Sequence, residues 1–351
     1  MLVETLLMAG GKKKGPRYFA ASVTVGSDPQ RLFVFSHSNG VFTALPIPDA
    51  PTAGVNDVRW SHSGRYLAVT VGSEVRIYKR SGSSFVLLLP AIAPAGGTVN
   101  GVAWSPDDAF LAVAHTNSPR LSIYARTGDT FTKLPNPASL PTATAHDVAF
   151  SPDGVYLAVA YQATQGVAIY KRSGSTFTRL PDLSQSAGSG SRRVVWSPDG
   201  VHFAVGLGSA GNTVSNSLRI YRRNPDDTFT RIAESTGESF VNGITYTPDG
   251  RYLIVVPIGF LFQSIRFLER SGDVYTEIKQ SSLNQVSDVT RAAISDDGRY
   301  LALSARMTFV GGGYFVYALS GTDPTLHMGS SHNITGTGAV AFWPVAIPGT
   351  R

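Results

Sequence analysis

The side chains best suited to binding or catalysis recur along the chain at intervals of 44 to 50 residues. These are Asn56, Asn100, His146, Arg192, Asn242, Thr290 and Gly338, and Asp57 and Asp147 directly follow two of them. Amides, carboxylates, an imidazole and a guanidinium brought together could hold a polar ligand or a partner's loop by hydrogen bonds. The candidate binding residues are therefore Asn56, Asp57, Asn100, His146, Asp147, Arg192 and Asn242. The alternative, local capping of strand ends, is favoured because Asn and Asp often serve that purpose.

Linear catalytic and metal-binding motifs are not found in the chain. The seven histidines are scattered without metal-ligand spacing, and the chain has no cysteine. A Gly-x-Ser-x-Gly elbow and a P-loop are missing, and residues 206–211 (GLGSAG) precede no predicted helix. His146 and Asp147 could supply a general base, but no nucleophile or second acid can be placed beside them. The sequence therefore predicts no catalytic residues, cofactor or metal, although propeller enzymes assemble their sites across blades.

A repeated block positions these residues. An apolar marker residue before a turn of the Ser-Pro-Asp-Gly type falls at Trp60, Trp104, Phe150, Trp196, Tyr246, Ile294 and Phe342. The spacings are 44, 46, 46, 50, 48 and 48 residues, a period that suits four strands per unit. Within residues 102–135, short apolar segments alternate with turns and predict four strands. A lone four-stranded sheet cannot bury both its apolar faces, whereas sheets stacked around a ring bury both.

Counting the blocks predicts an all-β fold, a seven-bladed β-propeller of four-stranded antiparallel blades. Six blocks are complete, and the seventh marker lies in a lone strand, Gly338–Phe342. The missing strands are expected at Tyr18–Val25, Arg31–Phe35 and Val41–Leu45, so the C-terminal strand would close the N-terminal blade. The predicted parts are an arm (1–17), one propeller (18–343) and a tail (344–351).

Two motifs carry a family resemblance. The run SPDGVYLAV at Ser151–Val159 resembles the core of WD-repeat-like propellers of bacteria and their viruses. Together with IYKRSGSTFTRLP at Ile169–Pro181, it is similar to repeats of bacteriophage virion and tail proteins. The resemblance covers about residues 18–343 and implies the fold and a virion component, with no catalytic motif.

The strand order separates two kinds of loop. The Ser-Pro-Asp-Gly turns and the third-to-fourth turns are short and lie on one face, whereas the other connections vary in length and form the variable-loop face, the preferred contact surface. Basic residues recur at the third-to-fourth turns, at Lys79, Arg80, Arg126, Lys171, Arg172, Arg222, Arg223 and Arg270. Because they surround acidic inner turns and lack a stacking platform, we predict solvated turns and no specific nucleic-acid binding.

The overall composition limits which classes of protein the chain can belong to. Apolar residues make up 42% and charged residues 15%, which suits a packed chain, and the net charge of +6 identifies no partner. The start, MLVETLLM, is too short to span a bilayer and lacks a basic leader, so neither a membrane span nor a signal peptide is predicted. The chain begins at Met1 or, equally, at Met8. The flexible basic arm that follows is a solvated tail or a docking arm formed by Lys12, Lys13, Lys14 and Arg17.

Three functional hypotheses follow. The leading one is a non-enzymatic structural and interaction protein, a rigid propeller present in several copies in a symmetric bacteriophage virion (tail, fibre or capsid-associated). Its partners would be other virion proteins and its location the virion, after synthesis in the host cytoplasm; the alternative location is the bacterial cytoplasm. The second is a module that binds a receptor or carbohydrate with the variable-loop face, the ligand being a host receptor or glycan. The third is a propeller-type lyase or hydrolase.

Overall fold

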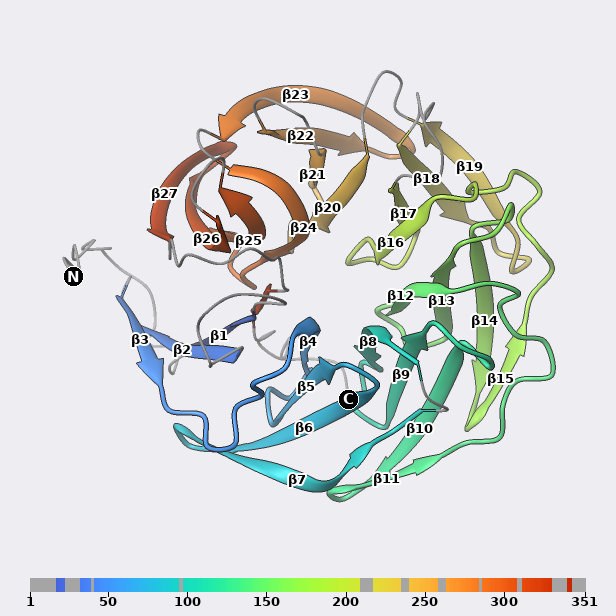
Figure 1. The fold of residues 1–351 in the computed structure, drawn as a ribbon. Coiled ribbons are helices and arrows are strands. Elements are labelled where there is room, and N and C mark those ends of the chain that lie inside the picture. The colour runs from blue at the N-terminus through green and yellow to red at the C-terminus, as the bar shows by residue number, and fades with distance from the viewer. Residues whose placement is uncertain are drawn as a thin grey trace.

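The structure is a computed structural model. It describes residues 17–22, 32–38, 41–94, 97–208, 217–234, 240–257, 263–283, 286–307, 311–329 and 340–342. Within these residues every secondary-structure element is a β-strand. The strands form seven four-stranded antiparallel sheets arranged as a ring around a central axis (Figure 1). The predicted seven-bladed propeller is therefore confirmed. No helix among the described residues has the length and apolar character to cross a membrane.

The first four blades contain sixteen strands. Blade 1 consists of β28 (Val340–Phe342), β1 (Arg17–Ser22), β2 (Leu32–Ser38) and β3 (Val41–Leu45). Blade 2 consists of β4 (Val55–Trp60), β5 (Tyr66–Val71), β6 (Glu74–Ser81) and β7 (Ser84–Ile92). Blade 3 consists of β8 (Val99–Trp104), β9 (Phe110–His115), β10 (Leu121–Thr127) and β11 (Thr130–Lys133). Blade 4 consists of β12 (Ala145–Phe150), β13 (Tyr156–Tyr161), β14 (Val167–Ser173) and β15 (Thr176–Arg179).

The last three blades contain twelve strands. Blade 5 consists of β16 (Ser191–Trp196), β17 (His202–Leu207), β18 (Leu218–Arg223) and β19 (Phe229–Glu234). Blade 6 consists of β20 (Val241–Tyr246), β21 (Tyr252–Pro257), β22 (Gln263–Ser271) and β23 (Val274–Leu283). Blade 7 consists of β24 (Val286–Ile294), β25 (Tyr300–Met307), β26 (Gly311–Ser320) and β27 (Asp323–Gly329).

The ring closes as the sequence predicted, through the C-terminal strand. β28 pairs with β1 at three positions: Phe342 lies opposite Phe19, Ala341 opposite Ala20 and Val340 opposite Ala21. The strand that ends the sequence thereby becomes the innermost strand of the first blade. Residues 1–16 and 343–351, which include most of the predicted arm and the whole predicted tail, lie outside the described residues.

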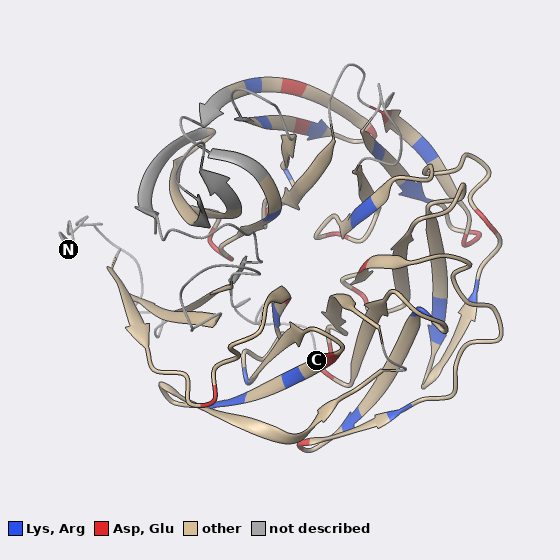
Figure 2. Cartoon of the chain, viewed as in Figure 1, with Lys and Arg blue, Asp and Glu red and all other residues tan. Residues whose placement is uncertain are grey.

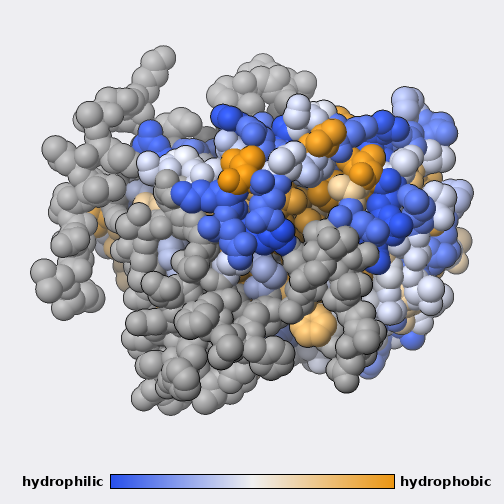
Figure 3. Space-filling view, turned by 90° about the horizontal axis from the view of Figure 1, so that it is seen from above, coloured by the Kyte–Doolittle hydropathy of each residue, from blue (hydrophilic) through white to orange (hydrophobic). Residues whose placement is uncertain are grey.

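The hydrophobic core lies between neighbouring blades. Strand β9, like β5, β13 and β17, is buried along its whole length because a blade covers each of its faces. Between blades 2 and 3, for example, Tyr66 and Ile77 pack with Trp104 and Leu111, and the rings of Tyr66 and Trp104 lie 5.8 Å apart. Each blade boundary contains such a layer, so the scaffold is held together by apolar burial around the whole ring. On the side seen in Figure 3, the coloured surface is mostly hydrophilic, with apolar areas between the polar ones.

The inner turns are stabilised by their own side chains. In blade 4, Ser151 Oγ donates a 2.5 Å hydrogen bond to Asp153 and accepts one of 2.9 Å from the backbone N–H of Tyr156. The Asp153 carboxylate also accepts from the N–H of Val155. The same arrangement recurs at Ser105, Ser197, Thr247 and Ser295. The repeated Ser-x-Asp spacing thus fixes the turn that begins each second strand.

The basic residues at the third-to-fourth turns are paired across blade boundaries. Three pair with the corresponding outer turn of the following blade: Lys79 with Asp129 at 2.5 Å, Lys171 with Asp227 at 2.6 Å and Arg222 with Asp273 at 2.5 Å. Three pair with an inner turn of the preceding blade: Arg172 with Asp107 at 2.8 Å, Arg223 with Asp153 at 2.6 Å and Arg270 with Asp199 at 2.7 Å. These basic side chains stay partly exposed, and the sequence did not reveal their ion pairs because each acid lies on another blade.

Candidate functional site

The innermost strands surround the axis and contain charged residues of both signs (Figure 2). The position three residues before the first six markers is occupied by a charged residue or glycine: Asp57, Gly101, Asp147, Arg193, Gly243 and Arg291. The glycines leave room for long side chains. A Cβ on Gly101 would lie 3.1 Å from Asp147 Oδ1 and 3.0 Å from the carbonyl oxygen of His146. The charged groups can therefore reach across the axis to one another.

Four of these residues, together with Arg59, form what we call the axial cluster: Asp57, Arg59, Asp147, Arg193 and Arg291. Arg291 lies 3.2 Å from Asp57 Oδ2 and 3.0 Å from Asp147 Oδ1, so it links blade 7 to blades 2 and 4. Arg59 lies 3.6 Å from Asp57 and 3.8 Å from Asp147. Asp57, Asp147 and Arg291 are almost completely buried. Burial alone would raise the pKa of the Asp147 carboxyl, but Arg291, Arg193 and Arg59 together hold it below its ordinary value.

Arg193 is held by backbone carbonyls. Its guanidinium donates to the carbonyl oxygens of Thr290 at 2.7 Å, Arg192 at 2.9 Å and Asn242 at 3.2 Å. Burial, together with the positive charge of Arg291, lowers the pKa of Arg193 to about 9. The axial cluster thus contains three guanidinium groups and two carboxylates, and it has an excess of one positive charge.

One residue further toward the variable-loop face lies the axial mouth, which consists of His146, Gln162, Arg192 and Asn242. Arg192 Nη1 lies 3.3 Å from His146 Nδ1, and His146 Nε2 lies 3.4 Å from Gln162 Oε1. Burial and the charge of Arg192 lower the pKa of His146 to about 4, so its imidazole is neutral at pH 7. With Nδ1 accepting from Arg192, the ring proton is assigned to Nε2, which donates to Gln162.

The candidate residues named by the sequence separate into three groups. Asn56 and Asn100 each donate an amide hydrogen bond to the next blade, to the carbonyls of Val99 at 3.0 Å and Ala145 at 2.8 Å, rather than to the backbone of their own strand ends. Asp57 and Asp147 belong to the axial cluster. His146, Arg192 and Asn242 meet at the axial mouth, where Asn242 Oδ1 is buried and has no hydrogen-bond partner.

Four residues of the axial cluster and the axial mouth were not predicted from the sequence: Arg59, Arg193, Arg291 and Gln162. The signal that could have found Arg193 and Arg291 is that they occupy the same position of the repeat as Asp57 and Asp147. Gln162 has no such signal, because it lies in a loop of variable length. Thr290 contributes its backbone carbonyl to Arg193, whereas Gly338 lies outside the described residues.

The proposed docking arm falls largely outside the structure. Lys12, Lys13 and Lys14 lie outside the described residues, and Arg17 is the first residue of β1. Over the part of the chain that the structure describes, no group of three or more His, Asp or Glu residues is placed to hold a metal ion.

The geometry of the axial mouth suits chemistry in which negative charge develops on oxygen. A guanidinium stabilises an oxyanion by charge and hydrogen bonds, most strongly where water is largely excluded. A neutral imidazole beside it can accept a proton. The amide oxygen of Asn242 is buried beside them and accepts no hydrogen bond in this structure. The arrangement can therefore bind a polar carbonyl compound and assist the attack of water on it.

Solved structures of other proteins share this fold. No family model matches the chain, and no curated protein matches its sequence. The chain is similar to a putative 6-phosphogluconolactonase from Bacteroides uniformis, with a TM-score of 0.73, 16% identity, and coverage of 94% of this chain and 100% of that one. It is similar to a periplasmic gluconolactonase of Pseudomonas aeruginosa, with a TM-score of 0.71, 15% identity, and coverage of 95% and 99%. The β-propeller domain of Cps50 (Swd1) from Myceliophteria thermophila gives a TM-score of 0.63, 14% identity, and coverage of 83% and 90%.

These similarities correct the functional expectation. At such identities they show the fold alone, and the propeller is shared with all three structures. Two of the three are named as lactonases, which are enzymes, and none carries the name of a phage protein. The expectation of a non-enzymatic virion scaffold is therefore wrong, and the resemblance to phage virion and tail proteins is not supported. The hypothesis of a propeller hydrolase, which ranked third, fits the comparisons better.

Proposed function

We propose that the chain is a hydrolase that opens the lactone ring of a sugar acid at the axial mouth. The observation that carries the proposal is the contact between the neutral His146 imidazole and the Arg192 guanidinium, above a cluster with an excess positive charge. The names of two similar structures support the choice of substrate class. Because the axial cluster fills the axis below, substrate would enter from the variable-loop face.

In the proposed reaction, the lactone carbonyl oxygen takes the place of His146 as the acceptor for Arg192. Water attacks the carbonyl carbon, and the C=O electron pair moves to the oxygen beside Arg192. His146 Nδ1, now released from Arg192, accepts the proton of the attacking water. The tetrahedral intermediate collapses as the ring C–O bond breaks, and His146 returns its proton to the departing ring oxygen. The products are a hydroxyl group and a carboxylic acid, which ionises in solution.

The pKa of His146 couples binding to this step. Burial lowers the pKa most, and the charge of Arg192 lowers it further. When the substrate's oxygen draws the Arg192 guanidinium away from Nδ1, the second effect weakens and the imidazole becomes a stronger base. Arg192 would thereby both stabilise the charge on the carbonyl oxygen and control the basicity of His146.

The proposal is tested by measuring hydrolysis of glucono-δ-lactone and 6-phosphoglucono-δ-lactone in a pH-stat, with the uncatalysed rate subtracted. We expect turnover, with a loss of about 100-fold or more in kcat for His146→Ala, in line with general-base catalysis. The matched control is His62→Ala, an exposed histidine on the opposite face, which should retain full activity.

Two results would contradict the proposal. One is the absence of turnover above background on both lactones with the folded protein. The other is turnover that His146→Ala and Arg192→Ala leave unchanged, because the reaction would then occur elsewhere on the molecule.

A further inference from the structure

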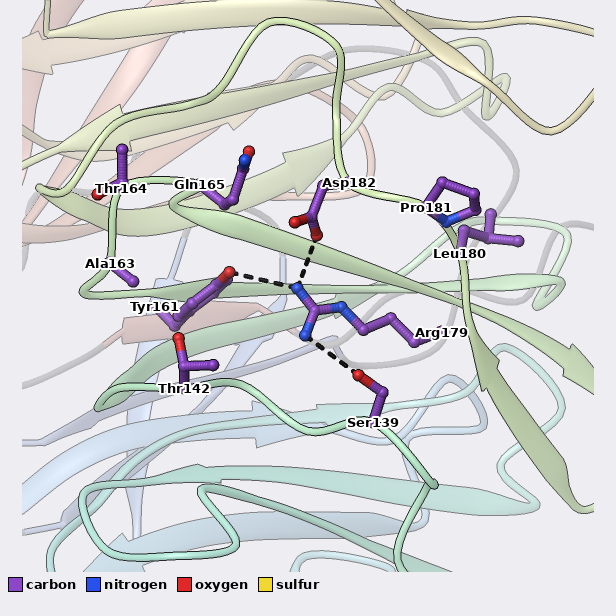
Figure 4. Close-up of a pocket in the computed structure, with 10 residues that line it drawn as sticks. All are labelled: Ser139, Thr142, Tyr161, Ala163, Thr164, Gln165, Arg179, Leu180, Pro181 and Asp182. Carbon is purple, nitrogen blue, oxygen red and sulfur yellow. Dashed lines mark hydrogen bonds and ion pairs between the residues drawn. The ribbon is translucent and has the colours of Figure 1, made fainter.

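A concave site lies on the variable-loop face, above blade 4 and away from the axis. It is a cavity of about 600 Å³, a volume within the usual range for small-molecule sites. Its walls come from three connections: residues 134–144 between β11 and β12, 162–166 between β13 and β14, and 180–190 between β15 and β16. Figure 4 shows Arg179 crossing the site, with Tyr161, Asp182 and Ser139 around its guanidinium.

Arg179 holds the walls together and is itself fully occupied. Its Nη2 donates to Asp182 Oδ1 at 2.7 Å and to the Tyr161 hydroxyl at 3.4 Å. Its Nη1 donates to the carbonyl of Leu140 at 3.1 Å and to Ser139 Oγ at 3.5 Å. Tyr170 also fixes the 134–144 connection, through a 2.9 Å hydrogen bond to the Ser139 carbonyl. The cavity is therefore built by a rigid hydrogen-bond network before any ligand arrives.

The charge of the cavity is balanced. Arg179 is its only basic and Asp182 its only acidic residue among the lining side chains, and the two form an ion pair. All four Nη hydrogens of Arg179 have acceptors, so an anionic ligand would have to displace existing partners. The balance favours a ligand without net charge.

The remaining groups match a hydroxylated ring. The Asp182 side chain is 46% exposed and uses Oδ1 for Arg179, so its second oxygen can accept hydrogen bonds from hydroxyl groups. Further hydroxyl and amide groups come from Thr142, Thr164 and Gln165, and the apolar part of the wall from Ala163, Leu180 and Pro181. Carboxylate, amide and hydroxyl groups beside apolar carbon complement the two kinds of surface that a sugar ring presents.

From these features we infer that the blade 4 cavity is a binding site for a neutral sugar unit. The site is separate from the axial mouth, and the inference does not depend on lactone hydrolysis. The two share the 162–166 connection, since Gln162, which contacts His146, directly follows Tyr161.

The test uses the full chain on an array of neutral, sialylated and sulfated glycans, followed by calorimetric titration with the best neutral oligosaccharide. We expect saturable binding to neutral glycans that is insensitive to ionic strength. Asp182→Ala should weaken it by about 10-fold or more, the effect of losing a hydrogen bond to a charged group. Asp226→Ala, an exposed aspartate on the opposite face, should leave it unchanged.

A second variant keeps the inference testable if Asp182→Ala loosens the adjoining loop. Thr164→Val removes one exposed hydroxyl group without changing side-chain size, and we expect a several-fold weaker affinity. His146→Ala should leave glycan binding intact, which separates this site from the axial mouth. Preference for sulfated or sialylated glycans, no neutral binder, or binding unaffected by both cavity variants would each overturn the inference.

Discussion

Replacement of Arg291 by Met should strongly destabilise the propeller. The side chain is 2% exposed and lies within 3.2 Å of one carboxylate and 3.0 Å of another. Met fills much of the same volume but leaves Asp57 and Asp147 buried, with only Arg59 at 3.6 and 3.8 Å as an ion-pair partner. Removing one partner from a buried ion pair costs about 3–5 kcal/mol.

This loss converts into a measurable change in the melting temperature. An unfolding entropy of about 2.1 cal/mol/K per residue, over 351 residues, gives roughly 0.7 kcal/mol/K for the whole chain. The midpoint should therefore fall by about 4–7 °C in calorimetry or circular dichroism. The control is Arg251→Met, because Arg251 pairs with Glu269 at 2.9 Å while its side chain is 60% exposed, and exposed pairs contribute little to stability.

Lowering the pH should reduce the difference in melting temperature between the wild type and Arg291→Met. The pKa of Asp147 is lowered in the folded protein, so the ion pair contributes its full stability above the ordinary carboxyl value of about 3.9. The contribution is lost as the pH falls below that value toward the folded pKa. Combining Arg291→Met with Asp57→Asn and Asp147→Asn should recover part of the loss, because no uncompensated carboxylate remains. A midpoint for Arg291→Met equal to that of Arg251→Met would refute this account of the axial cluster.

Two further predictions concern the axial mouth. The pKa of His146 is lowered to about 4, so kcat/KM for lactone hydrolysis should be constant around neutral pH and fall as the pH drops through about 4. An inflection near the ordinary imidazole pKa of about 6.5 would contradict the assigned environment. Gly208→Ala would place a Cβ 2.5 Å from Arg192 Cγ and 3.1 Å from Asn242 Oδ1, so Arg192 must move. This variant should lower kcat/KM by about 10-fold or more while changing the free energy of unfolding by less than about 2 kcal/mol, and unchanged kinetics would show that Arg192 does not act on the substrate.

The fold could be predicted from the sequence because its signals are local and repeated. Marker residues such as Trp104 and Phe150, each followed by a Ser-Pro-Asp turn, fix the number of blades and the start of each second strand. The closing strand was predictable for the same reason, since Phe342 is a marker whose own block lacks the other three strands.

The candidate site was predicted only in part, because its contacts join distant blades. His146, Arg192 and Asn242 were found, since they occupy one position of the repeat. Arg291 was not, because its guanidinium reaches Asp147 and Asp57 across the ring, 144 and 234 residues away along the chain. The ion pairs between turns were missed for a similar reason: Arg223 and Asp153 are 70 residues apart. Repetition reveals which residues are equivalent, whereas side-chain length and ring geometry decide which of them meet.

The position of Arg291 in the chain has a consequence for biosynthesis. Asp57 and Asp147 leave the ribosome long before Arg291, which belongs to the last complete block. A partly synthesised chain of four or five blades would hold the two carboxylates only with the longer contacts of Arg59, at 3.6 and 3.8 Å. Closure of such a smaller ring would lack the contacts of 3.2 and 3.0 Å that Arg291 makes with both acids. The axial cluster therefore stabilises the closed ring fully only when the seventh blade is present.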